Sequence, residues 1–194
     1  LDSIFSGGKA SSVRRRYGLQ GPYLILSQHA VPHQADQAGA QVRQTLKALA
    51  HVGLPVIASS PNTDSGGEVI LRILKSSRAV RFFPSLPHAD YLGLLREASA
   101  LVGNSSSGII EAPAFGTPAV DIGVRQAGRE RTAHVLSSPH RASAIEAAVR
   151  KAISPAFRRR ISRVRSPYGD GKTTPKVVRL LVAIAINDQL LTKS

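Results

Sequence analysis

Apolar and polar positions follow one another in blocks that predict alternating strands and helices. Short apolar runs recur along the chain, and the first of them is the segment YLILS at residues 23–27. Longer stretches between the runs carry apolar residues three and four positions apart, as at Ala38, Val42, Leu46 and Leu49. Apolar runs are typical of strands buried on both faces, and the wider spacing is typical of amphipathic helices. We predict strands over residues 23–27, 55–58, 80–83, 101–102, 119–122 and 134–136, and helices over residues 35–52, 68–74, 91–95, 141–152, 155–163 and 174–187.

Strands that alternate with helices predict an α/β fold with a doubly wound parallel sheet, which is a Rossmann-like domain. Right-handed crossovers place helices on both faces, and a ligand then binds at the carboxyl ends of the strands. Residues 1–20 are polar, basic and rich in glycine and serine, so we expect a linker or leading loop there. Residues 21–194 form the single domain that this pattern predicts.

Composition narrows the classes of function. The 194 residues carry a net charge of +14, and residues 141–194 alone hold 12 basic and 3 acidic side chains. Only 5% of the residues are aromatic and no nucleic-acid reading motif is present, so we expect the basic residues to form a solvated face and no nucleic acid to bind. No apolar run is long enough to span a bilayer and no signal peptide opens the chain, which favours a cytoplasmic enzyme.

Two residue types are missing from the chain. Cysteine is absent, which excludes disulfides and thiolate metal sites. Methionine is also absent, even at position 1, where Leu1 stands, so we expect the chain to be part of a longer protein. No metal-ligand constellation, catalytic triad or P-loop stands out, and we expect neither a metal nor a cofactor.

The most informative segment is GNSSSGIIEAP at residues 103–113, which follows a predicted strand and leads into a short helical pattern. Glycine and serine at such a turn leave backbone N–H groups unpaired and pointing outward, where the helix dipole favours an anion. Glu111 can accept hydrogen bonds from sugar hydroxyls, and Arg125 and Arg129 can neutralise phosphate charge. Together these groups suit a nucleotide diphosphate. Individually, each also fits a plainer role, as a helix N-cap, an exposed helical glutamate or loop charges.

The succession of these motifs resembles one family. GNSSSGIIEAPAFGTPAVDIG followed by RQAGRE is similar to the nucleotide-binding core of UDP-N-acetylglucosamine 2-epimerases, most of all those of the hydrolysing branch. Further segments occur in the order and spacing of the family: His29, PNTDSG at 61–66, LPHADY at 86–91 and SPYGDGK at 166–172. The resemblance covers the second half of such an enzyme, which implies that the N-terminal domain is missing from this chain.

The resemblance implies roles for individual residues. Ser105 and Ser106 would contact the diphosphate, Glu111 would hold the ribose hydroxyls, and Arg129 rather than Arg125 would be the direct phosphate partner. His29 would face the diphosphate and the reacting sugar, where a near-neutral pKa would let it stabilise the departing phosphate or pass a proton.

Two further residues are weaker candidates. Asn62 lies in a turn that borders the ligand in the hydrolysing branch, although its neighbours are also what any tight loop contains. His88 would lie close to the base through main-chain contacts. The complete enzyme would have two Rossmann-like domains in the glycosyltransferase-B arrangement, with the active site between them and the carboxylates that act at C2 in the other domain.

The implied reaction converts UDP-N-acetylglucosamine to N-acetylmannosamine and UDP without a redox cofactor. Three alternatives for the function stay open at this point: a non-hydrolysing epimerase, a nucleotide-sugar glycosyltransferase domain and a non-catalytic UDP-binding module. For the assembly, a homo-oligomer also stays open. We expect the isolated chain to be inactive, because the acid and base groups at C2 are not among these 194 residues.

Overall fold

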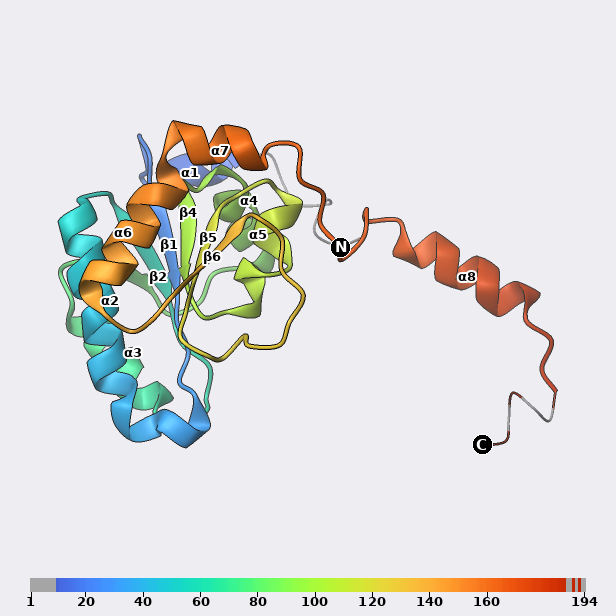
Figure 1. The fold of residues 1–194 in the computed structure, drawn as a ribbon, viewed down its shortest axis with the longest axis horizontal. Coiled ribbons are helices and arrows are strands. Elements are labelled where there is room, and N and C mark those ends of the chain that lie inside the picture. Colours follow the sequence, from blue (N-terminus) through green and yellow to red (C-terminus); the bar gives the residue numbers. More distant parts are fainter. Residues whose placement is uncertain (1–9, 188–189, 191, 193–194) are drawn as a thin grey trace.

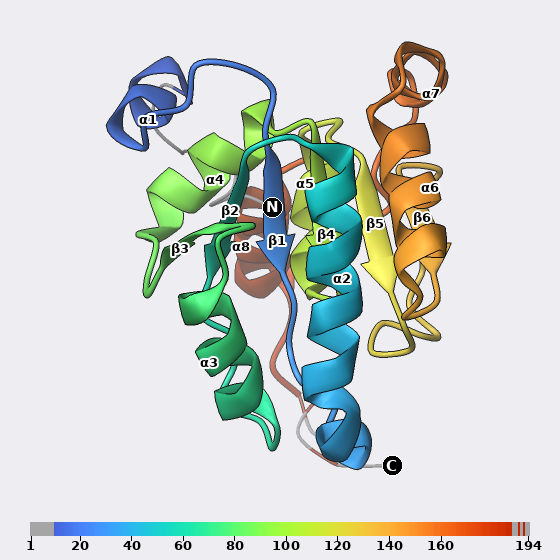
Figure 2. The same ribbon diagram turned by 90° about the vertical axis from the view of Figure 1, so that its left-hand side faces the viewer.

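The computed structural model describes residues 10–187, 190 and 192, and its centre is a six-stranded parallel sheet (Figures 1 and 2). The strands are β1 (Leu24–Ser27), β2 (Val56–Ser59), β3 (Arg81–Phe83), β4 (Ala100–Gly103), β5 (Ala119–Ile122) and β6 (Val135–Ser138). Their order across the sheet is β3-β2-β1-β4-β5-β6, and every neighbouring pair is parallel. The predicted doubly wound Rossmann-like fold is therefore confirmed.

Helices cover both faces of the sheet. The helices are α1 (Ala10–Arg16), α2 (Ala38–Val52), α3 (Gly67–Ser76), α4 (His88–Glu97), α5 (Glu111–Ala114), α6 (Ala142–Ile153), α7 (Pro155–Ile161) and α8 (Thr173–Ala183), with 3₁₀ turns η1 (Pro32–Gln37) and η2 (Ser106–Gly108). Helices α2, α3 and α6 pack on one face, whereas α1, α4 and α5 pack on the other (Figure 1).

Alternate strand residues feed two separate cores. Leu24 and Leu26 of β1 belong to the core under α2, α3 and α6, while Tyr23 and Ile25 belong to the core under α1, α4 and α5. All four side chains are at most 1% exposed. Full burial of such a side chain contributes roughly 1.5–3 kcal/mol, so a strand covered on both faces is built mainly from apolar residues. This is why most of the strands appear in the sequence as apolar runs.

The start of the described chain differs from the prediction of a linker or leading loop over 1–20. Within residues 10–20, helix α1 packs against α4, and Val13 and Leu19 are only 4% and 6% exposed. Arg16 donates to both carboxylate oxygens of Asp90 at 2.8 and 2.7 Å. The prediction is wrong for residues 10–20 because a helix of seven residues is too short to show a clear periodicity. Residues 1–9 lie outside the described residues.

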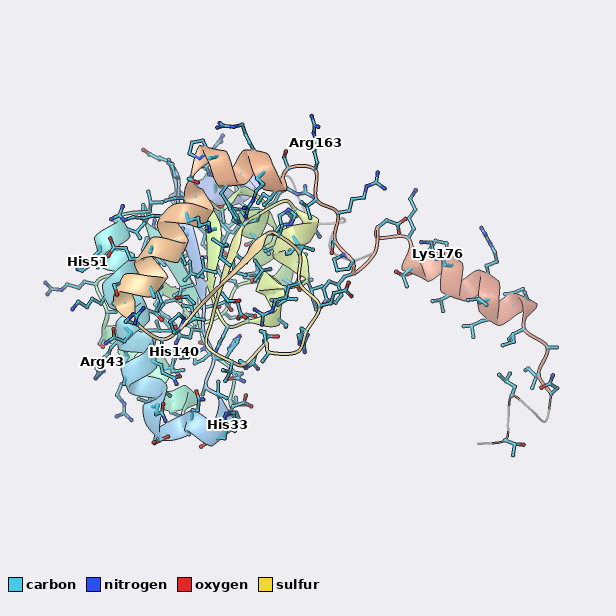
Figure 3. All side chains as sticks on the ribbon, in the orientation of Figure 1. His33, Arg43, His51, His140, Arg163 and Lys176 are labelled. Carbon is cyan, nitrogen blue, oxygen red and sulfur yellow. The ribbon has the colours of Figure 1, made fainter. Side chains whose placement is uncertain are left out.

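Helix α8 extends away from the body of the domain (Figure 1). Its side chains are exposed, and they include Val177, Leu180 and Leu181. Arg163, before α8, and Lys176, within it, point into solvent (Figure 3). None of the helices built from the described residues has the length and apolar character that crossing a membrane requires.

Candidate functional site

Four loops meet at the carboxyl edge of the sheet, around the neighbouring strands β1 and β4. The chain leaves β1 for α2 on one face and leaves β4 for α5 on the other (Figure 2). Such a reversal opens a crevice in which doubly wound proteins bind their ligands. The loops after β1, β2, β4 and β5 contribute His29, Asn62, Asn104 and Gln126, and hydrogen bonds join these residues into one network.

Asn104 is the central connection of this network. Its side-chain Oδ1 accepts a hydrogen bond from the His29 backbone N–H at 2.7 Å, and its Nδ2 donates to the His29 carbonyl at 2.9 Å. The Asn104 carbonyl accepts from Gln126 Nε2 at 2.8 Å. At 1% exposure, Asn104 therefore holds the loops after β1, β4 and β5 together from within the protein.

His29 is held in one tautomer. Its Nδ1 accepts a hydrogen bond from the Asn62 backbone N–H at 3.0 Å. Because a nitrogen that accepts carries no proton, the neutral ring has its proton on Nε2. The ring therefore offers an Nε2–H donor and no second acceptor.

The pKa of His29 is lowered to about 4, first by burial and then by the nearby Arg125 guanidinium, with Asp64 acting in the opposite direction. The expectation of a near-neutral pKa is therefore wrong for the free protein. Burial disfavours the imidazolium, and the sequence could not show that a cation would lie next to the ring. At neutral pH His29 is an uncharged hydrogen-bond donor.

The turn after β4 depends on glycine at position 103. Gly103 has a φ of 136°, and a Cβ at this position would lie 2.0 Å from the carbonyl oxygen of Ser27. The close approach lets the backbone N–H groups of Asn104 and Ser105 both donate to that oxygen, at 3.1 and 3.3 Å. Only glycine combines this backbone conformation with the absence of a side chain.

Most N–H groups of the serine segment face inward rather than outward. Ser105 Oγ accepts from the Ser107 N–H at 3.3 Å, and the N–H groups of Gly108, Ile109 and Ile110 donate to carbonyls of Ser105 and Ser106. The expectation of several unpaired N–H groups is wrong for these positions. The chain turns tightly through η2 before the four residues of α5, so the backbone satisfies its own donors. The hydroxyl of the half-buried Ser106 lies at the same turn.

Glu111 is the first residue of α5 and is half-buried. The hydroxyl group of nearby Tyr91 forms a 2.5 Å hydrogen bond with the Ser107 hydroxyl. The pKa of Tyr91 is raised, first by burial and also by the negative charge of Glu111, while the bond to Ser107 lowers it. Glu111 therefore lies beside the serine turn at the carboxyl edge of the sheet.

The loop after β2 brings an acid and an arginine together. The Asn62 side-chain amide donates to Asp64 Oδ2, and Arg125 Nη2 lies 3.9 Å from the same oxygen. Arg125 Nη1 also donates to the Asn104 carbonyl at 3.4 Å. The structure thus places Arg125, 27% exposed, within the network of His29 and Asn104.

Arg129 and His88 lie outside this network. Arg129 is exposed, and its backbone N–H donates to the Gln126 carbonyl at 3.4 Å. His88 is exposed at the start of α4, three positions before Tyr91. The structure does not bring these two side chains to His29, whereas it does bring Asn62, Arg125 and the serine turn there.

Comparison with known proteins places the whole arrangement in one family. The family model described as UDP-N-acetylglucosamine 2-epimerase matches residues 4–182. The chain belongs to the UDP-N-acetylglucosamine 2-epimerase family. The resemblance seen in residues 103–130 is therefore confirmed.

Relatives in this epimerase family are named for two different sugar nucleotides. A hydrolysing UDP-N,N'-diacetylbacillosamine 2-epimerase from Legionella pneumophila is 32% identical over 185 residues, which are 92% of this chain and 48% of that protein. A UDP-N-acetylglucosamine 2-epimerase from Neisseria meningitidis is 36% identical over 145 residues, which are 73% of this chain and 38% of that protein. The chain thus spans about half the length, or less, of these relatives.

Solved structures show the same fold at low identity. MnaA from S. aureus, in a co-structure with UDP, has a TM-score of 0.71 at 16% identity, and the match covers 93% of this chain and 51% of that one. The glycosyltransferase WaaG has a TM-score of 0.55 at 16% identity, with coverage of 91% and 51%. The predicted likeness to one domain of a glycosyltransferase-B type enzyme is confirmed at the level of the fold.

Three residues of this epimerase-family site were not predicted from the sequence. Asn104 and Gln126 connect the loops, and Arg131 donates to the Gln126 carbonyl at 2.7 Å. Asn104 stands directly after the strand-ending Gly103 and within the GNSSSG motif, and Gln126 is the second residue of RQAGRE, so both motifs could have drawn attention to them. Arg131 directly follows RQAGRE in a polar loop, where nothing distinguishes it from a solvated residue.

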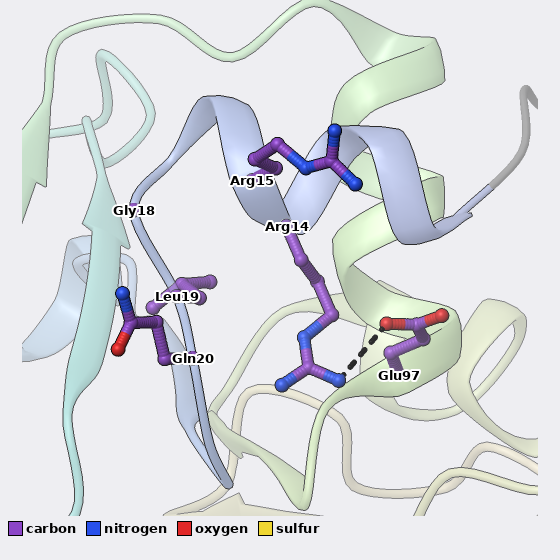
Figure 4. Close-up of a pocket in the computed structure, with 6 residues that line it drawn as sticks. All are labelled: Arg14, Arg15, Gly18, Leu19, Gln20 and Glu97. Carbon is purple, nitrogen blue, oxygen red and sulfur yellow. Dashed lines mark ion pairs between the residues drawn. The ribbon is translucent and has the colours of Figure 1, made fainter.

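A separate cavity of about 480 Å³ lies at the amino ends of the strands, far from this network (Figure 4). It is bounded by Arg14, Arg15, Gly18, Leu19, Gln20 and Glu97. Arg14 and Glu97 form an ion pair of 3.3 Å across it. Because the doubly wound architecture places ligands at the carboxyl ends, we assign no role in epimerisation to this cavity.

Proposed function

We propose that this chain is the UDP-binding half of a hydrolysing UDP-N-acetylglucosamine 2-epimerase. The observation that carries the proposal is the junction of His29 and the serine turn through Asn104 at the point where the strand order reverses. Family membership and the position of this junction both favour a nucleotide-sugar ligand there.

In this proposal, different side chains of the site contact different parts of UDP. We propose that the hydroxyls of Ser105 and Ser106 and the charge of Arg125 meet the diphosphate, with Arg129 joining them from its exposed loop. Glu111 would accept hydrogen bonds from the ribose hydroxyls. Asn62 and His88 would border the ligand through their loops. Charged groups in such bonds make them about twice as strong as neutral ones.

His29 would act as a donor rather than as an acid. Its Nε2–H can bond to a phosphate oxygen because its Nδ1 is already occupied by the Asn62 N–H. As the C1–O bond breaks, negative charge grows on the departing UDP, and a preorganised donor stabilises that charge. A bound diphosphate would also raise the pKa of His29 again, because an adjacent anion favours the imidazolium.

The proposed reaction has two balanced steps. In the first, a base removes the proton at C2 while UDP leaves C1, which forms 2-acetamidoglucal. In the second, water adds its hydroxyl to C1 and a proton returns to the opposite face of C2, which yields N-acetylmannosamine. We place the base and acid at C2 in the other half of the enzyme, because Asp64 already bonds to Asn62 and lies next to Arg125, and Glu111 is assigned to the ribose hydroxyls.

The names of the relatives mention two sugar nucleotides. The hydrolysing relative is named for UDP-N,N'-diacetylbacillosamine, and the relative from Neisseria is named for UDP-N-acetylglucosamine. The runner-up function is a non-hydrolysing epimerase, which would return UDP-N-acetylmannosamine. Release of UDP separates the two outcomes directly.

Helix α8 supports the idea of a missing half. Val177, Leu180, Leu181 and Ile184 have helical spacing of three and four residues, and each is at least 45% exposed. An apolar stripe on a helix normally packs against another surface. We propose that the preceding half of the epimerase length covers this stripe, since the chain spans only about half of its relatives.

Binding of UDP, UMP and uridine to the chain tests the nucleotide site. Calorimetry should give an affinity order of UDP over UMP over uridine, because two phosphates offer more charge to the arginines and serines. A variant Arg163→Met, remote from the site, should leave this order unchanged. Equal affinity for UDP and uridine would contradict the proposed diphosphate site.

Turnover tests the proposed division between two halves. The chain alone should release no UDP from UDP-N-acetylglucosamine, whereas fusion to an N-terminal epimerase half should produce UDP and N-acetylmannosamine. In that fusion, His29→Ala should lower kcat/KM by about 10²-fold, the scale for loss of one transition-state donor. UDP release by the single domain that depends on His29 would show that the catalytic groups lie within this chain.

A further inference from the structure

The loop between β5 and β6, residues 123–134, is tied to the sheet by a buried acid. Asp121 lies in β5, where its backbone is in register with Gly103 of β4 and Ser137 of β6. Its side chain is 2% exposed. An ionised carboxylate at this depth requires a partner, because burial without one is strongly unfavourable.

Arg131 is that partner, and it makes three contacts at once. Its Nη1 lies 2.9 Å from Asp121 Oδ2 and donates to Ser137 Oγ at 2.8 Å. Its Nη2 donates to the Gln126 carbonyl at 2.7 Å. A planar guanidinium with donors in fixed directions can hold all three groups, which the single ammonium of lysine cannot do in the same geometry.

The contacts continue from Arg131 to the site. Gln126, 2% exposed, donates through Nε2 to the Asn104 carbonyl, and the Asn104 side chain holds the His29 backbone. Arg125, directly before Gln126, donates to the same Asn104 carbonyl and lies next to His29. A chain of direct contacts therefore runs from Asp121 through Arg131 to the residues around His29.

We propose that Arg131 is a positioning residue: anchored by Asp121, it locks the loop 123–134 so that Arg125 is held against the phosphate site. The part of this inference that concerns phosphate rests on the proposed UDP-binding function. Arg131 itself touches no ligand in this scheme. It removes the freedom of the loop, so that the charge of Arg125 is in place before a nucleotide arrives.

The first experiment measures the position of Arg125 without any ligand. Burial lowers the pKa of His29 most, the nearby Arg125 guanidinium lowers it further, and Asp64 raises it. Arg131→Lys and Arg131→Met should both raise the pKa of His29, measured by NMR titration, by about one unit, because a released Arg125 no longer acts steadily on the ring. Arg141→Met, which removes an exposed arginine from the next loop at the same edge, should leave that pKa unchanged.

Arg131→Lys keeps the positive charge of residue 131 but changes its hydrogen-bonding geometry, so it shows which of the two matters. If only the positive charge of residue 131 mattered, Arg131→Lys would behave as the wild type. Arg131→Met could fail to fold because the Asp121 carboxylate is left unpaired. The double variant Asp121→Asn with Arg131→Met removes this carboxylate charge, and it still lacks the hydrogen bond from Arg131 to the Gln126 carbonyl. An unchanged pKa of His29 in folded Arg131→Lys and in the folded double variant would overturn the proposal.

The second experiment measures nucleotide binding. Arg131→Lys should lower the affinity for UDP about tenfold and leave the affinity for uridine unchanged, because the loop acts on the phosphates. A wild-type chain that binds no UDP would refute the proposed function, yet the titration of His29 would still decide the role of Arg131. Equal losses for UDP and uridine would mean a general disturbance of the fold and would overturn the positioning role.

Discussion

Replacement of Asn104 by alanine provides the sharpest test of how the site is built. The substitution removes both side-chain hydrogen bonds to the His29 backbone, at 2.7 and 2.9 Å. It leaves a backbone N–H and a backbone carbonyl without these partners in a region where Asn104 is 1% exposed. An unsatisfied buried group costs about 1–3 kcal/mol, so we expect the free energy of unfolding to fall by about 2–5 kcal/mol.

Urea unfolding followed by far-UV circular dichroism measures this loss, since the chain has no tryptophan for fluorescence. The midpoint should fall while the slope with denaturant stays constant, which indicates a change in stability alone. Asn62→Ala is the matched control. Among the described residues, its side chain bonds to the partly exposed Asp64 in the same loop, so the loss of stability should stay below about 1 kcal/mol.

Two outcomes would contradict this account of Asn104. A loss below about 1 kcal/mol for Asn104→Ala would show that the junction between the loops after β1 and β4 does not depend on the amide. Equal losses of stability in Asn104→Ala and Asn62→Ala would show that the burial of Asn104 does not determine how much its hydrogen bonds to His29 stabilise the domain. Either result would remove the physical basis for treating the four loops as one site.

Three further predictions concern single groups. The pKa of His29 is about 4 in the folded protein against 6.5 when unperturbed, so the unfolded chain binds more protons between these values. The contribution of His29 to the free energy of unfolding should be complete above about pH 6.5 and decline by up to roughly 3 kcal/mol as the pH falls toward 4. A smaller decline of stability in His29→Asn over this pH range would confirm that His29 is the cause, whereas identical pH profiles of wild type and variant would refute it. Glu111→Gln should weaken UDP binding by about 1–3 kcal/mol with the fold intact, and unchanged affinity in calorimetry would return Glu111 to a solvated role. Gly103→Ala should destabilise the domain by more than about 2 kcal/mol in the urea assay, because the alanine Cβ would lie 2.0 Å from the Ser27 carbonyl oxygen. A loss below about 1 kcal/mol would show that the turn can relax.

The sequence predicted the fold well because the signals for it are local. A strand buried on both faces is mostly apolar, and the spacing of apolar residues shows which face of each helix points inward. The same locality explains the error at α1. Helix α1 is stabilised by contacts with α4, including the hydrogen bond from Arg16 to Asp90, and no local pattern in the sequence reveals these contacts.

The candidate site was predicted in part. The serine turn and His29 each stand at the end of an apolar run, so the sequence alone determined that both lie at the carboxyl edge of a parallel sheet. It also determined family membership, because several motifs occur in a set order. The roles of Ser105, Ser106, Glu111 and Arg129 in binding UDP stay predictions.

Only the tertiary structure decided how these groups meet. Strand order placed β1 next to β4, and this pairing brought Asn104 against the backbone of His29. Burial and the approach of Arg125 then lowered the pKa of His29, and the Asn62 N–H selected its tautomer. Such effects depend on close contacts between residues far apart in the chain, such as the 2.7 Å hydrogen bond between His29 and Asn104. Periodicity and motif spacing describe neighbours along the sequence, and therefore carry no information about those distances.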